Sequence, residues 1–200
     1  MYSWSIYNAP IDKYIYGDAK AGYAVNTFYI AVALLGCTAA ILGPWLERNG
    51  PRRGLFLGVS MFLIGYIIAA ISIKAKSIVG VYIGYGFFTG FGLGINYISP
   101  VSALQKWFPD MRGTAAGFAV GGFGAGSIVW GKVYIPAINA FGLPGSFIFL
   151  GCIMSGVMFT CALVMRTPPP GFTAGGMNIH GVVEHEDSKL LDDSKLHTPK

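Results

Sequence analysis

The chain has little charge and few cysteines. Only 12% of its 200 residues are charged, whereas soluble domains carry about 25% charged residues. Its cysteines, Cys37, Cys152 and Cys161, lie in apolar stretches and are too sparse for a disulfide framework or a zinc site. No basic region precedes a short apolar core at the start, so we expect no cleaved signal peptide. These absences argue against a soluble, disulfide-stabilised or zinc-binding protein.

Catalytic and metal-binding side chains are scarce in the apolar stretches. We expect no acidic residue inside the helical bundle, since none falls in the five full-length predicted spans, and Lys132 is the only candidate cation within one of them. The histidines, His180, His185 and His197, fall in the polar C-terminal stretch, where their irregular spacing predicts solvated loop residues rather than metal ligands. Because the spans lack a serine, histidine and acid set and a metal-ligand pair, we expect no enzyme, no metal and no cofactor.

Apolar sequence and glycine dominate the chain instead. Hydrophobic residues make up 54% of it, the mean hydropathy is +0.56, and 29 glycines are scattered without a collagen period, as expected for helices packed closely in lipid. The net charge of +5 comes from cations at the ends of apolar spans. Nucleic-acid binding needs a solvated basic stripe, so we expect no nucleic-acid partner. The composition predicts an all-α, multi-pass protein of the lipid bilayer.

Six apolar segments are predicted within residues 1–166, which would form one helical bundle. They are 1–16, 23–46, 54–73, 78–104, 114–138 and 146–165. The first is too short to cross a hydrocarbon core of about 30 Å. It is interpreted as half of a truncated first helix, with a short aromatic helix at the membrane interface as the alternative.

Residues 167–200 differ sharply from the bundle. The run Pro168-Pro169-Pro170-Gly171 stops the last helix, and the remainder is polar, acidic and short of aromatic residues. We therefore expect a disordered segment on the cytoplasmic side. Counting lysine and arginine at the two faces places the 43–53 segment, the 105–113 loop and this tail in the cytoplasm.

The 43–53 segment is a charged, turn-forming hinge between two long apolar stretches. Gly43 would allow close backbone approach at the end of one span, and Gly50 with Pro51 would form a tight turn. Glu47 could pair with a neighbouring arginine or with a helix N-terminus and so act as a latch between conformations. The alternative is that these charges only fix the topology.

Two motifs carry a resemblance to a known family. The spacing Gly43-x-x-x-Glu47-Arg48-x-Gly50-x-Arg52-Arg53 resembles the signature loop between the second and third helices of the major facilitator superfamily, with Glu47 where that family usually has aspartate. The run Trp107-Phe108-Pro109-Asp110-x-Arg112-Gly113-x-Ala115-x-Gly117, continued by Gly121-Gly122-Phe123-Gly124-x-Gly126, resembles the oxalate/formate antiporters and the monocarboxylate transporters. The opening Tyr2-Ser3-Trp4-Ser5 with Pro10 resembles the outer part of their first helix.

The resemblance implies a six-helix half of a transporter, with the C-terminal six-helix half missing. It implies alternating access to a small mono- or dicarboxylate such as oxalate, formate or lactate, by antiport or proton symport, between the first, fourth and fifth helices. Basic residues that neutralise the anion would lie in the missing half. The implied cytoplasmic gate comprises Gly43, Glu47, Arg48, Gly50, Arg52, Arg53, Asp110 and Arg112.

Polar side chains inside the spans are candidates for the substrate pathway, because they must find partners in the bundle or in a wet cavity. Asn96 and Tyr97 come just before Pro100, which frees a backbone carbonyl, and Tyr97 offers a hydroxyl and a flat ring. Contacts between helices are the alternative role for these two. Tyr7, Trp4 and Asn8 are further candidates, weighed against an interfacial aromatic belt.

Glycines at small-xxx-small spacing predict close helix packing. The representatives are Gly90, Gly94, Gly113, Gly117 and Gly121. Their density favours a bundle whose helices rock, although static packing would explain any single glycine. A non-transporting scaffold, or a half-transporter that needs a partner, remains the alternative function, because six helices alone cannot enclose a two-sided pathway.

Overall fold

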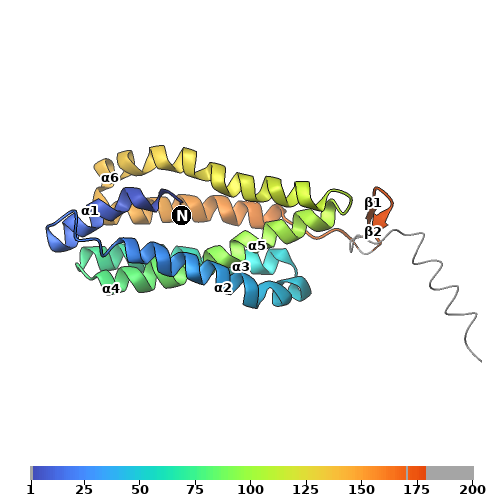
Figure 1. The fold of residues 1–200 in the computed structure, drawn as a ribbon, viewed down its shortest axis with the longest axis horizontal. Coiled ribbons are helices and arrows are strands. Elements are labelled where there is room, and N and C mark those ends of the chain that lie inside the picture. Colours follow the sequence, from blue (N-terminus) through green and yellow to red (C-terminus); the bar gives the residue numbers. More distant parts are fainter. Residues whose placement is uncertain (1, 170, 179–200) are drawn as a thin grey trace, which may run out of the picture.

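The apolar stretches form long helices in the computed structural model, which describes residues 2–169 and 171–178. Figure 1 shows these helices lying lengthwise beside one another. The helical elements in chain order are η1 (Tyr2–Trp4), α1 (Ser5–Tyr16), α2 (Val25–Asn49), α3 (Pro51–Lys74), α4 (Ile78–Val81), η2 (Tyr82–Thr89), α5 (Gly90–Trp107) and α6 (Arg112–Val164). Two short strands follow, β1 (Thr173–Ala174) and β2 (Met177–Asn178).

Among the described residues, four helices are long and apolar enough to cross a membrane: Val25–Asn49, Pro51–Lys74, Ile78–Trp107 and Arg112–Val164. The third of these runs without a break through α4, η2 and α5, and η2 is an eight-residue π-helix. A π-helical segment is rare and is found mostly where function or close packing demands it. Here it contains Gly84 and Gly86, both buried.

The helix α6 consists of two segments that meet at Gly142. This residue has φ of 70° and ψ of 172°, which is not helical and which glycine adopts readily. Figure 1 shows the segment before the break and the segment after it running side by side, so the chain reverses there. The predicted spans 114–138 and 146–165 leave a connection over 139–145, and the structure concentrates the reversal near Gly142.

The predicted hinge over 43–53 is helical except at one position. α2 continues through Gly43 to Asn49, and α3 begins at Pro51. Gly50 alone makes the turn, with φ of 81°. The expected close approach at Gly43 is wrong, since no atom lies within 4 Å of the position that a Cβ would occupy there.

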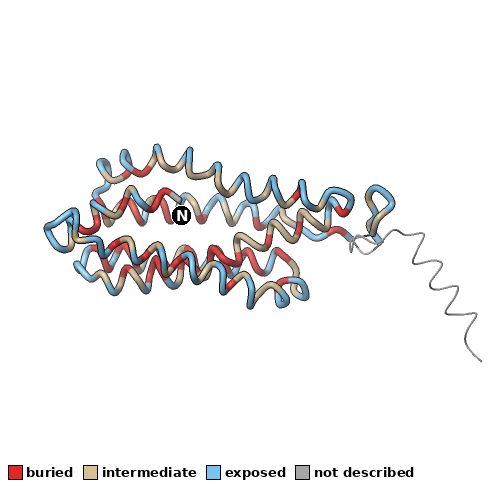
Figure 2. Tube along the Cα trace, in the orientation of Figure 1, coloured by how far each residue is buried: buried red, intermediate tan, exposed pale blue. Residues whose placement is uncertain are grey.

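α3 lies at the centre of the bundle. Half of its most apolar stretch is buried, against 17% for α2. Figure 2 shows that the buried positions gather on the facing sides of the helices. The core around α3 contains Phe62 and Tyr66 with Tyr85 of η2 and Phe147 of α6. Such an aromatic core holds helices of different spans against a common centre.

The chain after α6 departs in part from the expected disorder over 167–200. β1 and β2 pair as an antiparallel hairpin in which Thr173 lies opposite Asn178. The Trp107 ring lies 5.2 Å from that of Phe172, and the Trp107 indole donates a hydrogen bond to the Arg166 carbonyl at 2.9 Å. Residues 171–178 are therefore folded against the α5–α6 connection. Residues 179–200, with the three histidines, lie outside the described residues.

Candidate functional site

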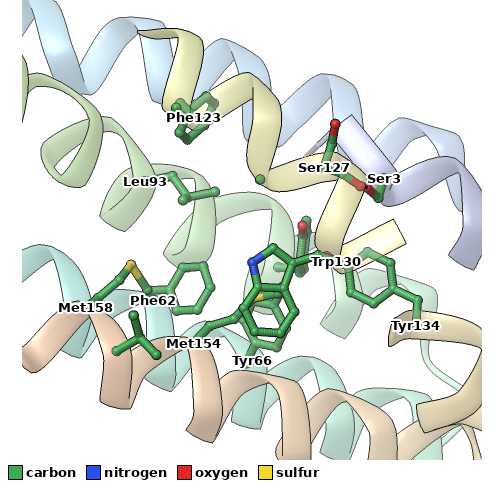
Figure 3. Close-up of a pocket in the computed structure, with 14 residues that line it drawn as sticks. Ser3, Phe62, Tyr66, Leu93, Phe123, Ser127, Trp130, Tyr134, Met154 and Met158 are labelled. Carbon is green, nitrogen blue, oxygen red and sulfur yellow. The ribbon is translucent and has the colours of Figure 1, made fainter. Parts of the chain in front are cut away.

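A cavity of about 240 Å³ lies between α3, η2, α5 and both segments of α6. Its walls are aromatic rings, thioethers and small residues, as Figure 3 shows. The lining residues are Ser3, Phe62, Tyr66, Tyr85, Leu93, Gly122, Phe123, Gly126, Ser127, Trp130, Tyr134, Met154, Val157 and Met158. This mixture of apolar walls and a few polar groups is typical of small-molecule sites.

Hydrogen-bonding groups in the lining are hydroxyls and one indole N–H. Tyr66, Tyr85 and Tyr134 come from three different elements, and Trp130 projects from the first segment of α6. No side chain of this lining carries a formal charge. The lining can therefore donate hydrogen bonds to an anion without supplying a positive charge.

Ser3 connects the start of the chain to this wall. Its hydroxyl donates a hydrogen bond to the Ser127 carbonyl at 3.2 Å, and Figure 3 shows the two serines beside each other. The bond joins residues 124 positions apart in the sequence. η1 thus closes one side of the cavity.

Trp4 and Tyr7 form a second layer behind the cavity wall, each with only 3% of its surface exposed. The Trp4 ring lies 4.1 Å from that of Tyr85, and the Tyr7 ring lies 5.1 Å from that of Tyr134. The Ser146 hydroxyl donates to the Leu143 carbonyl, so the Tyr7 hydroxyl donates to Ser146 at 3.2 Å. Trp4 and Tyr7, which were predicted to line the pathway, therefore pack behind two tyrosines that line the cavity.

Asn96 and Tyr97 also lie one layer behind the wall. The Asn96 amide donates to the Met158 sulfur at 3.7 Å, and the Tyr97 ring lies 5.3 Å from that of Phe123. Within the described chain, the side-chain oxygens of Asn96 and Asn8 are buried without a hydrogen-bond partner. Thus none of the five predicted pathway residues is among the lining residues, and four of them contact one that is.

The residues that line the cavity are not those predicted from the sequence. Tyr66, Tyr85, Tyr134 and Trp130 lie in apolar spans, yet each carries a polar atom that must be satisfied in a membrane. These polar atoms are the feature of the sequence that could have pointed to the cavity lining. The expectation of no acidic residue in the helices is also wrong, because Asp12 lies buried within α1.

Glu47 joins α2 to α5 at the opposite end of the bundle. Its carboxylate accepts a hydrogen bond from the Ser102 hydroxyl and forms an ion pair with Lys106 at 2.5 Å. The Glu47 side chain is half exposed, so solvent and salt screen the pair. Both of these partners lie on α5, Ser102 within the fourth predicted span and Lys106 just after it.

The other charged gate residues predicted from the sequence differ in their exposure. Arg48, Arg52, Arg53 and Asp110 are exposed, and Arg112 is partly buried at the start of α6. The Arg52 guanidinium lies 5.9 Å from the centre of the Phe56 ring. Gly50 shapes the turn described above.

The predicted packing glycines fall into two groups. A Cβ added at Gly90 would lie 2.8 Å from the Ala31 Cα, and one at Gly94 would lie 2.7 Å from the Leu35 carbonyl oxygen, both in α2. A second group meets no neighbouring atom within 4 Å. Its members are Gly113, Gly117 and Gly121, all on the first segment of α6.

Comparison with known proteins identifies the family. The sequence model described as "Major Facilitator Superfamily" matches residues 1–182. The chain belongs to the Major Facilitator Superfamily. This confirms the resemblance that the two motifs carry, and it makes the protein an integral, multi-pass membrane protein of a transporter family rather than an enzyme family.

Similar proteins within this superfamily are transporters by name. The chain is 28% identical to the oxalate:formate antiporter of Oxalobacter formigenes, over 84% of this chain and 38% of that protein. It is 27% identical to human monocarboxylate transporter 2, over 80% of this chain and 33% of the relative. An uncharacterised transporter of the same superfamily from Escherichia coli is 24% identical over 84% of the chain and 41% of that protein. The chain thus spans well under half the length of these relatives.

Proposed function

We propose that the protein transports a small mono- or dicarboxylate, such as oxalate, formate or lactate, by alternating access, as an antiporter or a proton symporter. The observation that carries the proposal is the cavity lined by Tyr66, Tyr85, Tyr134 and Trp130, whose side chains carry hydrogen-bond donors. Hydroxyl and indole N–H groups donate hydrogen bonds to carboxylate oxygens, and flat rings match a planar anion. Two similar proteins are named for such anions.

The proposal includes a second six-helix half that supplies the missing charge. The two segments of α6, with the four earlier helices, would make the six spans of one half. An anion without a cation partner is costly to hold inside a membrane. Since this cavity lining carries no charge, the neutralising lysine or arginine would come from the second half. The open glycine face with Gly117 and Gly121 would face that half, where small residues let helices approach closely.

Glu47 and Lys106 would then form the cytoplasmic gate. They connect α2 to α5, with Arg48 next to Glu47 in the chain and Arg52 and Arg53 in the first turn of α3. Both residues of the pair lie in this half, so the pair would hold the ends of α2 and α5 in place where they meet the second half. A half-exposed ion pair contributes little to stability, which suits a contact that rearranges as the second half approaches and withdraws.

Uptake by proteoliposomes tests the proposal. The protein encoded by the native full-length transcript is expressed, purified and reconstituted. Uptake of radiolabelled oxalate, formate and lactate into the vesicles is then measured with and without carboxylate inside them. Trp130→Leu removes an indole donor from the cavity, and Trp45→Leu makes the same change at a partly exposed position near the end of α2.

We expect carboxylate uptake by the wild type and by Trp45→Leu, and about tenfold weaker uptake by Trp130→Leu, the ratio that corresponds to about 1.4 kcal/mol. A wild type that folds but takes up none of the three anions would contradict the proposal and favour a non-transporting scaffold. Equal uptake by the two variants would place the substrate elsewhere.

A further inference from the structure

The connection between α1 and α2 is held by three side chains from three different elements. The Asp12 carboxylate accepts hydrogen bonds from the backbone N–H of Gly22 at 2.9 Å and of Ala24 at 3.0 Å. The Trp4 indole donates to the Ala24 carbonyl at 3.1 Å, and the Tyr82 hydroxyl donates to the Tyr23 carbonyl at 2.8 Å. We call this set of main-chain bonds to residues 22–24 the α1–α2 junction.

Asp12 is the buried ionisable member of the α1–α2 junction. Only 2% of its surface is exposed, and within residues 2–169 and 171–178 it forms no ion pair. Its charge is instead compensated by two N–H groups and by the positive end of α2, which begins at Val25. Breaking these hydrogen bonds would be costly, because the carboxylate would then be buried without a partner.

Gly22 allows the backbone to make the turn that Asp12 binds. Its φ of 78° lies in the left-handed region that glycine adopts without strain. The turn directs the Gly22 and Ala24 N–H groups toward the same carboxylate. The loop is thus shaped to bind Asp12 rather than merely to connect two helices.

The α1–α2 junction reaches the cavity through α1 itself. Asp12 lies on the helix that η1 leads into and that carries Tyr7, while Trp4 belongs to both the junction and the cavity support. The Trp4 ring packs on Tyr85 and the Tyr7 ring packs on Tyr134, and both of these tyrosines line the cavity. A shift of α1 relative to α2 would therefore move Trp4 and Tyr7, and with them the support of Tyr85 and Tyr134.

We propose that Asp12 is a positioning residue for substrate binding: it fixes α1 against the start of α2 and thereby sets the places of Tyr85 and Tyr134 in the cavity wall. The inference rests on the proposed transport function. It makes Asp12 neither a ligand of the substrate nor part of the cavity. The effect on substrate passes through Trp4 and Tyr7.

The test combines amide hydrogen exchange with uptake kinetics, both measured on the protein expressed from the native full-length transcript. Asp12→Asn keeps the size of the side chain and one acceptor but replaces the second acceptor with a donor. The matched control is Asp18→Asn, because Asp18 lies in the connection that Asp12 binds, is exposed, and accepts a hydrogen bond from the Lys20 backbone N–H at 2.9 Å. Asp12→Glu tests rescue by a second carboxylate.

For Asp12→Asn we expect about tenfold faster exchange in peptides covering residues 5–28, with peptides of α3 and α5 unchanged, because local opening and global unfolding are separable by exchange. We also expect the KM for uptake to rise about fivefold while the maximal rate stays within about twofold, a loss of binding rather than of the transport step. Asp12→Glu should restore part of both, and Asp18→Asn should change neither.

Unchanged exchange in residues 5–28 would overturn the inference, as would an equal loss of protection in α3 and α5, which would indicate general destabilisation. A normal KM beside altered local exchange would overturn the link from the α1–α2 junction to the cavity. If the wild type takes up no carboxylate, the transport proposal fails, and the exchange data alone decide whether Asp12 fixes α1.

Discussion

The glycines of α5 and those of the first segment of α6 have similar spacing but opposite surroundings. A Cβ at Gly92 would lie 2.5 Å from the Gly58 carbonyl oxygen, and at Gly90 it would lie 2.8 Å from the Ala31 Cα. At Gly117 and Gly121 nothing lies within 4 Å. The same sequence pattern thus serves main-chain contact in one helix and leaves an open face on another.

The packed glycines of α5 are expected to contribute to stability, and the open glycines of α6 to the motion of the proposed transporter. Helices that touch backbone to backbone gain packing along their whole crossing, so α5 with α2 and α3 forms the fixed part of the bundle. The open face of α6 contributes no such contact within the described chain. In the proposed transporter it is the surface that meets the second half and rocks against it.

Gly92→Val should give the largest effect on stability. The nearest atoms are the Gly58 carbonyl oxygen and the Phe62 backbone nitrogen, at 2.5 and 2.8 Å from the added Cβ, and neither can move without moving α3. Overpacking of this kind costs about 1–3 kcal/mol or more. Circular dichroism in detergent should show a melting temperature lower by about 5 °C or more. An unchanged melting temperature would mean that α3 and α5 are not in backbone contact.

Gly90→Ala should destabilise less. The added methyl meets the Ala31 Cα and carbonyl oxygen, both at 2.8 Å, so α2 must move away from α5. A smaller share of α2 than of α3 is buried in the apolar stretch, 17% against 50%, so α2 can shift more easily. We expect a loss of about 1–2 kcal/mol, within the range for overpacking, measured by the same melting experiment. A larger loss than in Gly92→Val would reverse the order of the two helix contacts.

Gly121→Ala is the control that defines the comparison. The added methyl enters open space, and alanine favours a helix over glycine by about 0.5–1 kcal/mol. The melting temperature should stay the same or rise by a few degrees. A clear fall would show that the face is packed and would remove the contrast with α5.

Glu47→Gln should give the smallest change, since it acts on the same helix pair as Gly90 but through an exposed ion pair. Exposed pairs contribute about 0.2–1 kcal/mol and are screened by salt. We expect a melting temperature within about 3 °C of the wild type, with the difference vanishing at high salt. A loss comparable to that of Gly90→Ala would assign the α2–α5 contact to charge rather than to packing.

The membrane class, the family and the main helices could be predicted from the sequence, because apolar length and the two motifs are local properties. The Gly50 and Gly142 turns also have local signals, since Gly50 directly precedes Pro51 and Gly142 lies two residues before Pro144. What could not be predicted depends on which faces meet. Spacing alone does not tell Gly90 from Gly117, and a tyrosine in a span, such as Tyr66, gives no sign of whether it lines a cavity or fills a core.

Asp12 shows the same limit from another side. The first segment is too short to cross the membrane, so nothing in the sequence places its carboxylate inside a helix bundle. Its partners, the N–H groups of Gly22 and Ala24, are backbone groups with no side-chain signature. Only the folded chain brings them together.

The most direct test of the account is Gly117→Leu, measured for stability and for carboxylate uptake on the same preparation. The residue is exposed and its Cβ position is open, so the account predicts a melting temperature within about 3 °C of the wild type together with loss of uptake, because the larger side chain blocks the approach of the second half. Normal uptake at normal stability would contradict it, since the open face of α6 would then be a lipid-facing surface with no part in transport.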